Sequence, residues 1–456
     1  EITEDNPRIK EYHFTSERKM MSIIRKKGKI KTSYVKGAPL FVLERCKEEF
    51  IDGRVRLINP ARRKELIKVS KEMEMGGLRV LGFAFKNVND ESQKFAENNL
   101  IFSGFYGMID PPRREVKKAI MEAISAGIKV KIITGDSEFT TRAVADKIGL
   151  KGESINGDYL ENLGEEKWDE VVRTKTIFAR VTPQQKLKIV EVLKKQNETV
   201  AVTGDGVNDI LALKKADIGI SMGIRGSDIA RDSSDIVLLD DNFATIMGGV
   251  KQGRRVFSNM KKSIKFLLSA NAALIFIIIL ALIIGMPLPF LPLAILWMNL
   301  VTDSLPALAL AVEPAERGIM KRAYLKKGLL SGIWQHILIA GIINLISVIW
   351  IFSWAFGEFG IDVARTIAIT TAIFFELFFV FSCKSDKSLF KTGISNNMIL
   401  IYAVLISSAL QILAIYTVLG SFFGFVSLTW MQLGIAVGTG TSGIIFFEGL
   451  KLIKKY

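Results

Sequence analysis

The stretch TGDGVND occupies residues 203–209 and follows the short apolar run Thr199–Val202. Thr134–Asp136 repeats the tripeptide TGD after a second apolar run, Ile128–Ile133. Both runs are short, β-branched and flanked by glycine. Across residues 101–240, apolar runs alternate with amphipathic stretches, which predicts a parallel sheet covered by helices. Because ligands gather at the carboxyl ends of parallel strands, we expect the two aspartates that end these tripeptides to face one site.

The composition of TGDGVND suits a phosphate and a magnesium ion. Glycine lets the backbone approach a phosphate closely. Asp205 and Asp209 offer hard oxygen ligands, and Mg²⁺ prefers one or two carboxylates together with phosphate oxygens. The alternative is a strand-to-helix turn that uses glycine and aspartate for local reasons. That alternative would be favoured for an isolated GDG, but this chain carries further motifs.

The C-terminal part of the chain consists of apolar runs of membrane-spanning length, whereas residues 1–262 are polar, charged and periodic. A spanning helix needs about 20 apolar residues, and this many such runs exceeds what a soluble core uses. No proline lies between Asn242 and Ser263, so one helix can continue into the first span. The expected spans are 263–285, 290–312, 329–356, 363–383, 398–420 and 428–447.

The net charge of +15 is distributed as in a membrane protein and not as in a nucleic-acid-binding protein. Cytoplasmic loops carry an excess of Lys and Arg, and alternate loops here do so, with Arg365 the exception on the other side. This parity puts the N-terminal part on the cytoplasmic side. The two cysteines, Cys46 and Cys383, imply no disulfide framework. The basic loop residues are Lys321, Arg322, Lys326, Lys327, Lys384, Lys387, Lys391, Lys451, Lys454 and Lys455.

Two acidic residues lie in the middle of expected spans, Asp303 and Glu376. Ionisable residues inside a membrane are costly and are candidates for function. Asn271, in the first span, offers a further oxygen, although hydrogen bonding between helices is an equal alternative for it.

The span around Asp303 predicts an oxygen-rich cage. Asn299, Thr302 and Asp303 are spaced i, i+3 and i+4 and share one helix face. Pro306 has no N–H for the carbonyl of Thr302, so that oxygen is expected to be free. Carbonyl and carboxylate oxygens together suit a hard cation.

These motifs together resemble those of the P-type ATPases. TGDGVNDILALKKADIGISMG (203–223) is similar to the family's hinge motif almost letter for letter, and KGAP (36–39), MIDPPR (108–113), ITGD (133–136) and FARVTPQQKLKIV (178–190) also match. The resemblance covers essentially the whole chain. It implies the C-terminal part of an α+β nucleotide-binding domain (1–100), the C-terminal part of a haloacid-dehalogenase-like α/β phosphorylation domain (101–242), and a six-helix transmembrane domain (243–456).

The resemblance implies ATP and Mg²⁺ as cofactors and transfer of the γ-phosphoryl group of ATP to an aspartate, a reaction that depends on positioning and charge neutralisation. Lys186 matches the phosphate-binding lysine and Asp205 the magnesium-binding aspartate. Asn208 and Asp209 match residues that support the metal and the phosphate. The loop beside the phosphate corresponds to Thr134, Gly135 and Asp136.

The same likeness implies a nucleotide site. Phe14 resembles the adenine-stacking aromatic, although an aromatic between polar residues is more often core. Asp110 and Arg113 resemble residues that contact the nucleotide or bridge the two soluble domains. Leu40 stands where the family has an acidic residue after KGAP. The expected cations around the nucleotide are Lys19, Lys36, Arg79 and Arg180.

NLVTDSLPALAL (299–310) resembles the sixth membrane helix of calcium pumps of the reticulum and secretory-pathway types. By that likeness Asn299 and Asp303 bind Ca²⁺, with Asn271, Thr302 and Glu376 nearby. Leu274 stands where the reticulum-type pump has a glutamate, so one ion per cycle is expected. Na⁺, Mn²⁺ and H⁺ are the alternative ions. Membrane lipid, ATP and the cation are the expected partners, and nucleic acid is not.

The sequence contains no DKTGT, the motif of the family's phosphorylated aspartate, and no TGES. We therefore expect a longer protein whose N-terminal part supplies both motifs, with a split pump as the alternative, and we expect this chain to be inactive alone. A non-catalytic fragment or partner subunit is the second hypothesis. A soluble phosphatase fused to a channel is disfavoured, because no DxD motif ends a strand.

Overall fold

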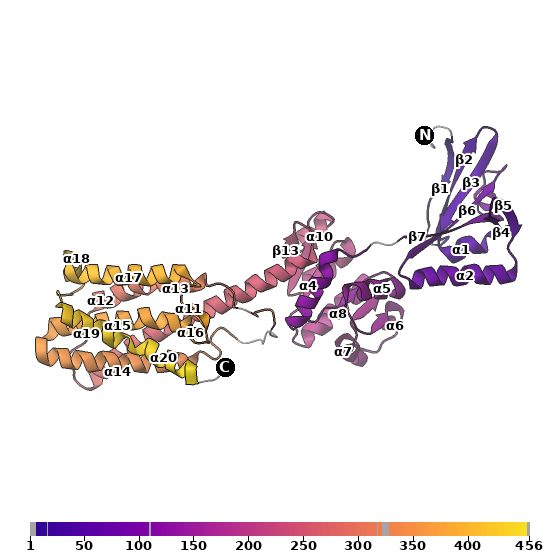
Figure 1. The fold of residues 1–456 in the computed structure, drawn as a ribbon. Helices are drawn as coiled ribbons and strands as arrows, with labels where there is room; N and C mark the ends of the chain where they lie inside the picture. The colour runs from indigo at the N-terminus through magenta and orange to yellow at the C-terminus, as the bar shows by residue number, and fades with distance from the viewer. Residues whose placement is uncertain (1–5, 16, 109–110, 317, 322–327, 454–456) are drawn as a thin grey trace. The chain divides into compact units, whose positions relative to one another are not determined.

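A computed structural model describes residues 6–15, 17–108, 111–316, 318–321 and 328–453. The chain divides into two compact units, Glu1–Met247 and Gly248–Tyr456. Figure 1 labels many of the helices and strands of both units.

The first unit opens with a seven-stranded sheet of order β1-β2-β3-β6-β7-β4-β5. β4 and β7 pair in parallel, and the other neighbours are antiparallel. Two helices, α1 (Pro39–Glu44) and α2 (Pro60–Met75), pack beside it (Figure 1). The strands are β1 (Arg8–Tyr12), β2 (Met20–Lys27), β3 (Ile30–Gly37), β4 (Cys46–Ile51), β5 (Arg54–Leu57), β6 (Arg79–Asn87) and β7 (Leu100–Met108); a short helix, α3 (Gln93–Ala96), precedes β7.

Local sequence explains these elements. Alternate residues of β2 are buried, as a half-buried strand requires. α2 begins with Pro60 at its first position, and the side chain of Asn59 accepts a hydrogen bond from the N–H of Arg62 at 2.7 Å. Cys46 is buried in the core beneath the sheet, where burial raises the pKa of its thiol to about 12. Both cysteines are free, as expected.

The boundary expected at residue 100 is wrong. Residues 100–108 form β7, which pairs with β6 and β4 inside the first sheet. Leu100 and Phe102 are buried in the core of that sheet. The apolar run therefore completes the first domain and does not open the second.

The rest of the first unit contains two three-stranded parallel sheets, of order β8-β10-β9 and β11-β12-β13. The parallel strands are as expected, but the single sheet is not found. Within the described residues, β8 (Ile132–Ile133) and β11 (Ala201–Gly204) each pair on one side only, so no strand joins the two sheets. The other strands are β9 (Ser154–Asn156), β10 (Ile177–Ala179), β12 (Ile218–Met222) and β13 (Ile236–Leu238), and the helices are α4 (Arg114–Ser125), α5 (Glu138–Ile148), α6 (Gly157–Glu161), α7 (Glu165–Thr174), α8 (Pro183–Lys195), the 3₁₀ turn η1 (Val207–Asp209), α9 (Ile210–Lys215) and α10 (Asp228–Asp232).

The second unit is a bundle of apolar helices, and six helical segments among its described residues are long and apolar enough to cross a membrane. They agree with the six expected spans. The first, α11 (Phe243–Ile283), is one unbroken helix, as the absence of proline predicted. The others are α12 (Pro292–Trp297) continued by the π-helical turn η2 (Met298–Thr302) and α13 (Ser304–Ala311), α14 (Trp334–Phe359), α15 (Ile361–Cys383), α17 (Met398–Tyr416), and α19 (Trp430–Gly440) with α20 (Ser442–Ile453); α16 (Leu389–Thr392) and α18 (Val418–Phe422) are short connectors.

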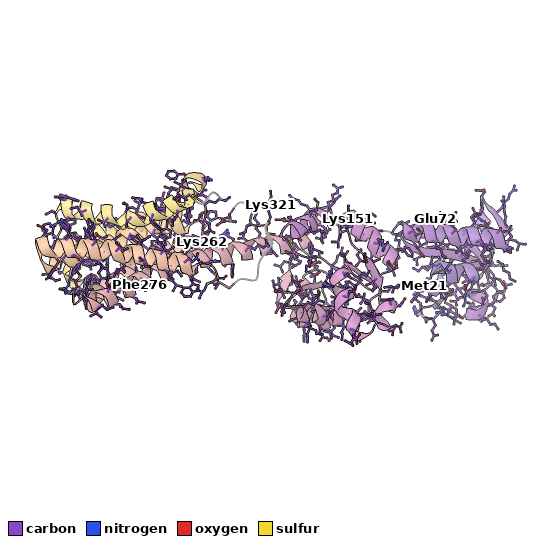
Figure 2. All side chains as sticks on the ribbon, turned by 90° about the horizontal axis from the view of Figure 1, so that it is seen from below. Met21, Glu72, Lys151, Lys262, Phe276 and Lys321 are labelled. Carbon is purple, nitrogen blue, oxygen red and sulfur yellow. The ribbon has the colours of Figure 1, made fainter. Side chains whose placement is uncertain are left out.

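The bundle packs most tightly around α15, which is buried along most of its length. Small residues permit this packing. A Cβ on Gly341 of α14 would lie 3.0 Å from the ring of Phe276 of α11, and Figure 2 labels Phe276 in the bundle. Gly440 and Gly443 make similarly close contacts with Phe374 and Phe375 of α15. Side chains that point inward from α15, Glu376 included, are therefore shielded from the surroundings.

Candidate functional site

The end of β11 brings Gly204 and Asp209 into close contact. A Cβ on Gly204 would lie 2.5 Å from the Cβ of Asp209, nearer than real carbon atoms approach. Only glycine therefore fits at residue 204 with Asp209 in its present place. The turn η1, which follows directly, positions the Asp209 carboxylate over the end of the strand.

Asp209 holds the side chain of Lys186. The Nζ of Lys186 lies 2.6 Å from Oδ1 of Asp209, and both side chains are largely buried. Lys186 lies in the first turn of α8, whose start is fixed by a capping box between Thr182 and Gln185. The cation is thus fixed both by its helix and by its carboxylate partner.

The first TGD loop is fastened to the end of β10. The N–H of Val181 donates to the carbonyl of Thr134 at 3.0 Å, and the N–H of Arg180 donates to that of Asp136 at 2.9 Å. Arg180 adopts φ of +51°, a left-handed conformation that costs energy in a non-glycine residue. Since α8 starts just after this segment, residues 134–136 and Lys186 belong to one connected region.

Asp205, Gly135, Asp136 and Asn208 are exposed at the ends of their strands. Among the described residues, no hydrogen bond or ion pair involves the side chain of Asp205. One available carboxylate, with phosphate oxygens and water completing the shell, fits the preference of Mg²⁺. The sequence predicts Asp209 as an indirect metal ligand, and in the structure its carboxylate accepts a hydrogen bond from Lys186.

One face of the seven-stranded sheet carries two of the cations expected to surround a nucleotide, Lys36 and Arg79. A cavity of about 250 Å³ is lined by Met21, Tyr34, Lys36, Phe83 and neighbouring residues. Arg79 lies on this face because it has the same alternation along β6 as Phe83, whereas Lys19 precedes β2 and has a left-handed φ of +53°. Figure 2 labels Met21, which lines the cavity floor.

The remaining expected nucleotide residues differ in their surroundings. Phe14 is 60% exposed, so it is not a core aromatic. The Nζ of Lys19 lies 4.7 Å from the ring centre of Phe41. Arg113 precedes α4, and its Nη1 donates to the carbonyl of Asp240 at 3.0 Å. Asp110 lies outside the described residues.

In the membrane unit, the structure brings together Asp303 and Glu376. Both are 1% exposed, and the segments that flank Asp303, η2 and α13, pack against α15, which carries Glu376. None of the four oxygens receives a hydrogen bond from any other described residue. Two buried carboxyl groups without a donor need a proton or a cation as partner.

The helix that carries Asp303 changes geometry just before it. Residues Met298–Thr302 form a π-helical turn, and the N–H of Asp303 donates to the carbonyl of Met298 at 3.0 Å. Such turns are frequent at functional sites. Thr302 is fully buried, and its Oγ1 donates to the same carbonyl of Met298.

Two expectations about this helix are corrected. The carbonyl of Thr302 is not free: it accepts a hydrogen bond from Oγ of Ser407 on α17 at 3.3 Å. Asn299 is only half-buried, and its amide donates to the carbonyl of Ile295 at 3.2 Å. The π-helical turn alters the periodicity, so Asn299 does not share the buried position of Thr302 and Asp303.

Asn271 is also not directed into the buried pair. It is exposed on α11, and its amide donates to the carbonyl of Leu267 in the same helix at 2.9 Å. Leu274, in contrast, is buried in the core of the bundle. Within the described residues, Asp303, which directly precedes α13, and Glu376 of α15 therefore form the buried acidic pair. The Asn271 side chain of α11 does not take part in it.

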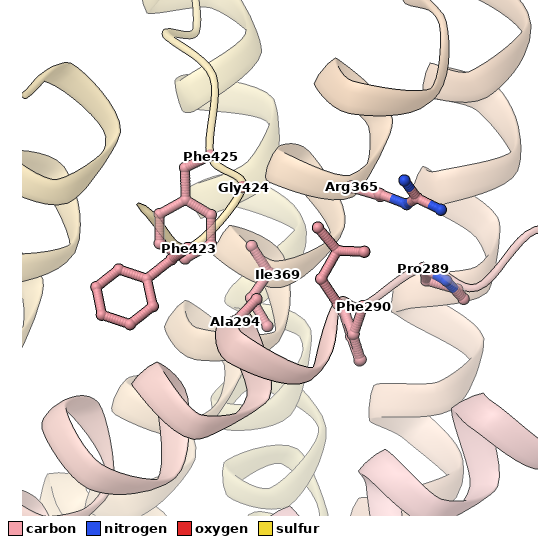
Figure 3. Close-up of a pocket in the computed structure, with 9 residues that line it drawn as sticks. Pro289, Phe290, Ala294, Arg365, Ile369, Phe423, Gly424 and Phe425 are labelled. Carbon is pink, nitrogen blue, oxygen red and sulfur yellow. The ribbon is translucent and has the colours of Figure 1, made fainter. Parts of the chain in front are cut away.

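A small cavity at the opposite end of the bundle from the basic loops is apolar. It has about 10 Å³ of free volume, room for about one water molecule. Figure 3 shows Arg365 beside it, and the Nε of Arg365 donates to the carbonyl of Leu288 at 3.1 Å. Arg365 therefore joins the start of α15 to the loop before α12.

Comparison with known proteins decides the family. Residues 287–453 match the family model described as "Cation transporting ATPase, C-terminus", and residues 1–115 match "P-type ATPase, cytoplasmic domain N". The chain belongs to the P-type cation-transporting ATPases, of the calcium-pump-like type. The match over residues 1–115 also includes β7, in agreement with its place in the first sheet.

Three curated relatives of this P-type ATPase chain carry the name calcium-transporting ATPase. It is 38% identical to the calcium-transporting ATPase of Bacillus subtilis over 91% of this chain and 48% of the relative. It is 38% identical to calcium-transporting ATPase 1 of Lactococcus lactis over 100% and 53%. It is 32% identical to human calcium-transporting ATPase type 2C member 1 over 100% and 50%. The chain spans about half the length of the curated relatives it matches.

Membership of the P-type ATPases and the six apolar helices make this an integral membrane protein with several spans. Buried hydrogen bonds near the acidic pair also involve residues that the motifs of this P-type chain do not include: Trp297, Thr370, Ser407 and Gln411. A signal was available, since Gln411 is a polar residue in the middle of an apolar span.

Proposed function

We propose that this chain is part of a calcium-transporting P-type ATPase and contributes to phosphoryl transfer, nucleotide binding and cation binding. The observation that supports this most is the buried pair Asp303 and Glu376, whose oxygens have no donor among the other described residues. Ionisable groups are retained within a membrane when they mark an ion or proton pathway. The names of the relatives favour Ca²⁺ as the cation.

The soluble part suits phosphoryl transfer from ATP to a carboxylate. In this step the bond from the γ-phosphorus to the bridging oxygen breaks, a bond to the carboxylate oxygen forms, and ADP leaves with the bridging oxygen. Lys186 is positioned to neutralise charge on the transferred group, and Asp209 orients it. Mg²⁺, when bound, would supply Lewis-acid stabilisation of the phosphate oxygens, and Asp205 is the residue to hold it.

The phosphorylated aspartate is proposed to come from a segment outside this sequence, which contains no DKTGT. The open edges of β8 and β11 support this. Each of these strands ends at a TGD tripeptide, and each lacks a partner on one side within the described residues. A strand added along these edges would end beside both tripeptides, because the strands of a parallel sheet end at one edge.

The nucleotide is proposed to lie over the exposed face of the seven-stranded sheet. The cavity beside Lys36 combines aromatic and aliphatic walls with a cation. Such a mixture suits a base and its charged phosphates. Arg79 extends the positive charge along the same face.

For the cation, we propose a single site at Asp303 and Glu376, completed by ligands from outside this chain. Two divalent ions would bring four positive charges to a region where the described residues offer two carboxylates. Leu274 adds an apolar side chain to the core where a further acid would be needed. In the absence of a cation, protons can neutralise the pair.

The test is cation-dependent phosphorylation of the full-length protein. Membranes containing it are incubated with radiolabelled ATP and Mg²⁺, with and without micromolar Ca²⁺, and acid-precipitated. A label that needs Ca²⁺ and is removed by hydroxylamine supports the proposal. If the label is independent of Ca²⁺ but requires Na⁺ or Mn²⁺, the transported cation would be that ion and not Ca²⁺.

A further inference from the structure

Helix α17 presents two buried polar side chains to the helices that carry the acidic pair. Ser407 and Gln411 are each 0% exposed and lie one helical turn apart. The rest of the buried face of α17 is apolar: Leu400, Ala403, Val404, Ala414 and Ile415. A polar side chain in such a place is costly unless its hydrogen bonds are satisfied.

Gln411 satisfies its hydrogen bonds by joining two other helices. Its Oε1 accepts from Nε1 of Trp297 on α12 at 2.8 Å. Its Nε2 donates to Oγ1 of Thr370 on α15 at 3.2 Å. Thr370 in turn donates to the carbonyl of Thr366 at 2.7 Å, which leaves its oxygen free to accept from Gln411. One amide therefore links the two helices through both of its polar atoms.

The two linked residues lie at matched positions relative to the acidic pair. Trp297 precedes Asp303 by six residues, and Thr370 precedes Glu376 by six residues. Both helices start at the end of the bundle where Arg365 contacts Leu288, so they run in the same direction. The link through Gln411 therefore lies at one level, about 9 Å along α15 from the carboxyl groups.

Ser407 acts nearer to the pair. Its Oγ donates at 3.3 Å to the carbonyl of Thr302, the group that Pro306 cannot reach with an N–H. This carbonyl immediately precedes Asp303, at the end of the π-helical turn. Ser407 thereby satisfies the backbone where the helix departs from α geometry, and it favours the turn that directs Asp303 inward.

We propose that Ser407 and Gln411 are positioning residues that fix the separation of Asp303 and Glu376 and so set which cation the site prefers. This inference rests on the proposed function. Two carboxylates repel each other when no cation lies between them. A link that resists their separation keeps the site at one size, and size, ligand number and rigidity distinguish Ca²⁺ from smaller divalent ions.

The test compares variants of the full-length protein in membranes. Gln411→Met removes both hydrogen bonds at similar side-chain length, and Ser407→Ala removes one. Ser353→Ala is the matched control, because Ser353 lies exposed on α14 and bonds only to the carbonyl of Ile349 in its own helix. Phosphorylation from ATP is measured against concentration for Ca²⁺ alone and for Mn²⁺ alone, together with nucleotide affinity.

For Gln411→Met we expect the Ca²⁺ concentration for half-maximal phosphorylation to rise about three- to tenfold. The preference for Ca²⁺ over Mn²⁺ should fall by about threefold or more, because a loosened pair adapts to the smaller ion. Ser407→Ala should change both quantities in the same direction. Ser353→Ala should leave them unchanged, and nucleotide affinity should be unchanged in all three variants.

The ratio of the two ions separates positioning from a general structural role, since simple loss of folded protein lowers the maximal label and leaves the ratio unchanged. An unchanged ratio in Gln411→Met would overturn the inference while the proposed function stands. If Gln411→Met does not reach the membrane, Trp297→Phe removes one half of the link and is judged by the same ratio. Absence of any cation dependence in the unsubstituted protein would overturn both the inference and the proposed function.

Discussion

The Nζ of Lys186 lies 2.6 Å from Oδ1 of Asp209, and Gly204 provides the space that lets Asp209 occupy this place. A lysine at the start of a helix, a carboxylate on a 3₁₀ turn and a glycine at a strand end thus form one unit. Because the cation is already oriented, little reorganisation is needed when a phosphate arrives.

This unit predicts the effect of removing the lysine. In the full-length protein, Lys186→Met should slow phosphorylation by about 10²-fold or more, as loss of one preorganised electrostatic donor does elsewhere. Lys188→Met is the matched control, since Lys188 is on the same helix and pairs with exposed Glu165 at 2.7 Å. Rapid-quench measurement of the labelled protein checks both. Equal rates for the two variants would remove Lys186 from the reaction.

A second prediction concerns magnesium. Asp205→Asn should raise the Mg²⁺ concentration needed for phosphorylation and leave nucleotide affinity nearly unchanged, because Asp205 follows a strand of a different sheet from the one that carries Lys36. Asp158→Asn, an exposed position on α6, is the control. Normal phosphorylation of Asp205→Asn at low Mg²⁺ would make Asp205 a structural residue.

Much of this soluble site follows from the sequence, because its residues lie within short motifs whose spacing is local. TGDGVND ends a strand, and the FARVTPQQK run places Lys186 in the first turn of α8. The arrangement of the strands into two sheets does not follow from local pattern. The position of β7 in the first sheet does not follow from local pattern either, because an apolar run does not indicate which sheet the strand joins.

The membrane site was less predictable. The sequence identifies Asp303 and Glu376, because charge is rare within a span. The sequence-based expectation for Asn299 was wrong, because the π-helical turn changes which residues share a helix face. The expectation of a free Thr302 carbonyl was also wrong, because its hydrogen-bond donor, Ser407, lies about 100 residues later in the chain. Bonds between distant helices depend on tertiary packing, which periodicity does not encode.

A third prediction follows for Asp303. Asp303→Asn should abolish cation-dependent phosphorylation from ATP while the protein still reaches the membrane, because a divalent ion loses one of two buried carboxylates. Asp362→Asn, at the exposed start of α15, is the control. The concentration dependence of labelling on Ca²⁺ is the measurement. Normal activation in Asp303→Asn would move the cation site elsewhere.

A fourth prediction is the number of ions bound. Equilibrium binding of ⁴⁵Ca, divided by the number of phosphorylatable sites, should give a ratio of about one, because the described bundle buries two carboxylates at mid-span. A ratio near two would refute the single site. Leu274→Glu should raise the ratio or alter the affinity if Leu274 faces the cation. No effect would show that Leu274 serves only the packing of α11.

The most direct test of the account is the acid-stable label itself. The full-length protein and the 456-residue chain are each incubated with radiolabelled ATP and Mg²⁺, with and without Ca²⁺. The account predicts a hydroxylamine-sensitive label on the full-length protein only when Ca²⁺ is present, and none on the chain alone, which has no DKTGT. A hydroxylamine-sensitive label on the chain alone, or a full-length protein that no cation activates, would contradict it.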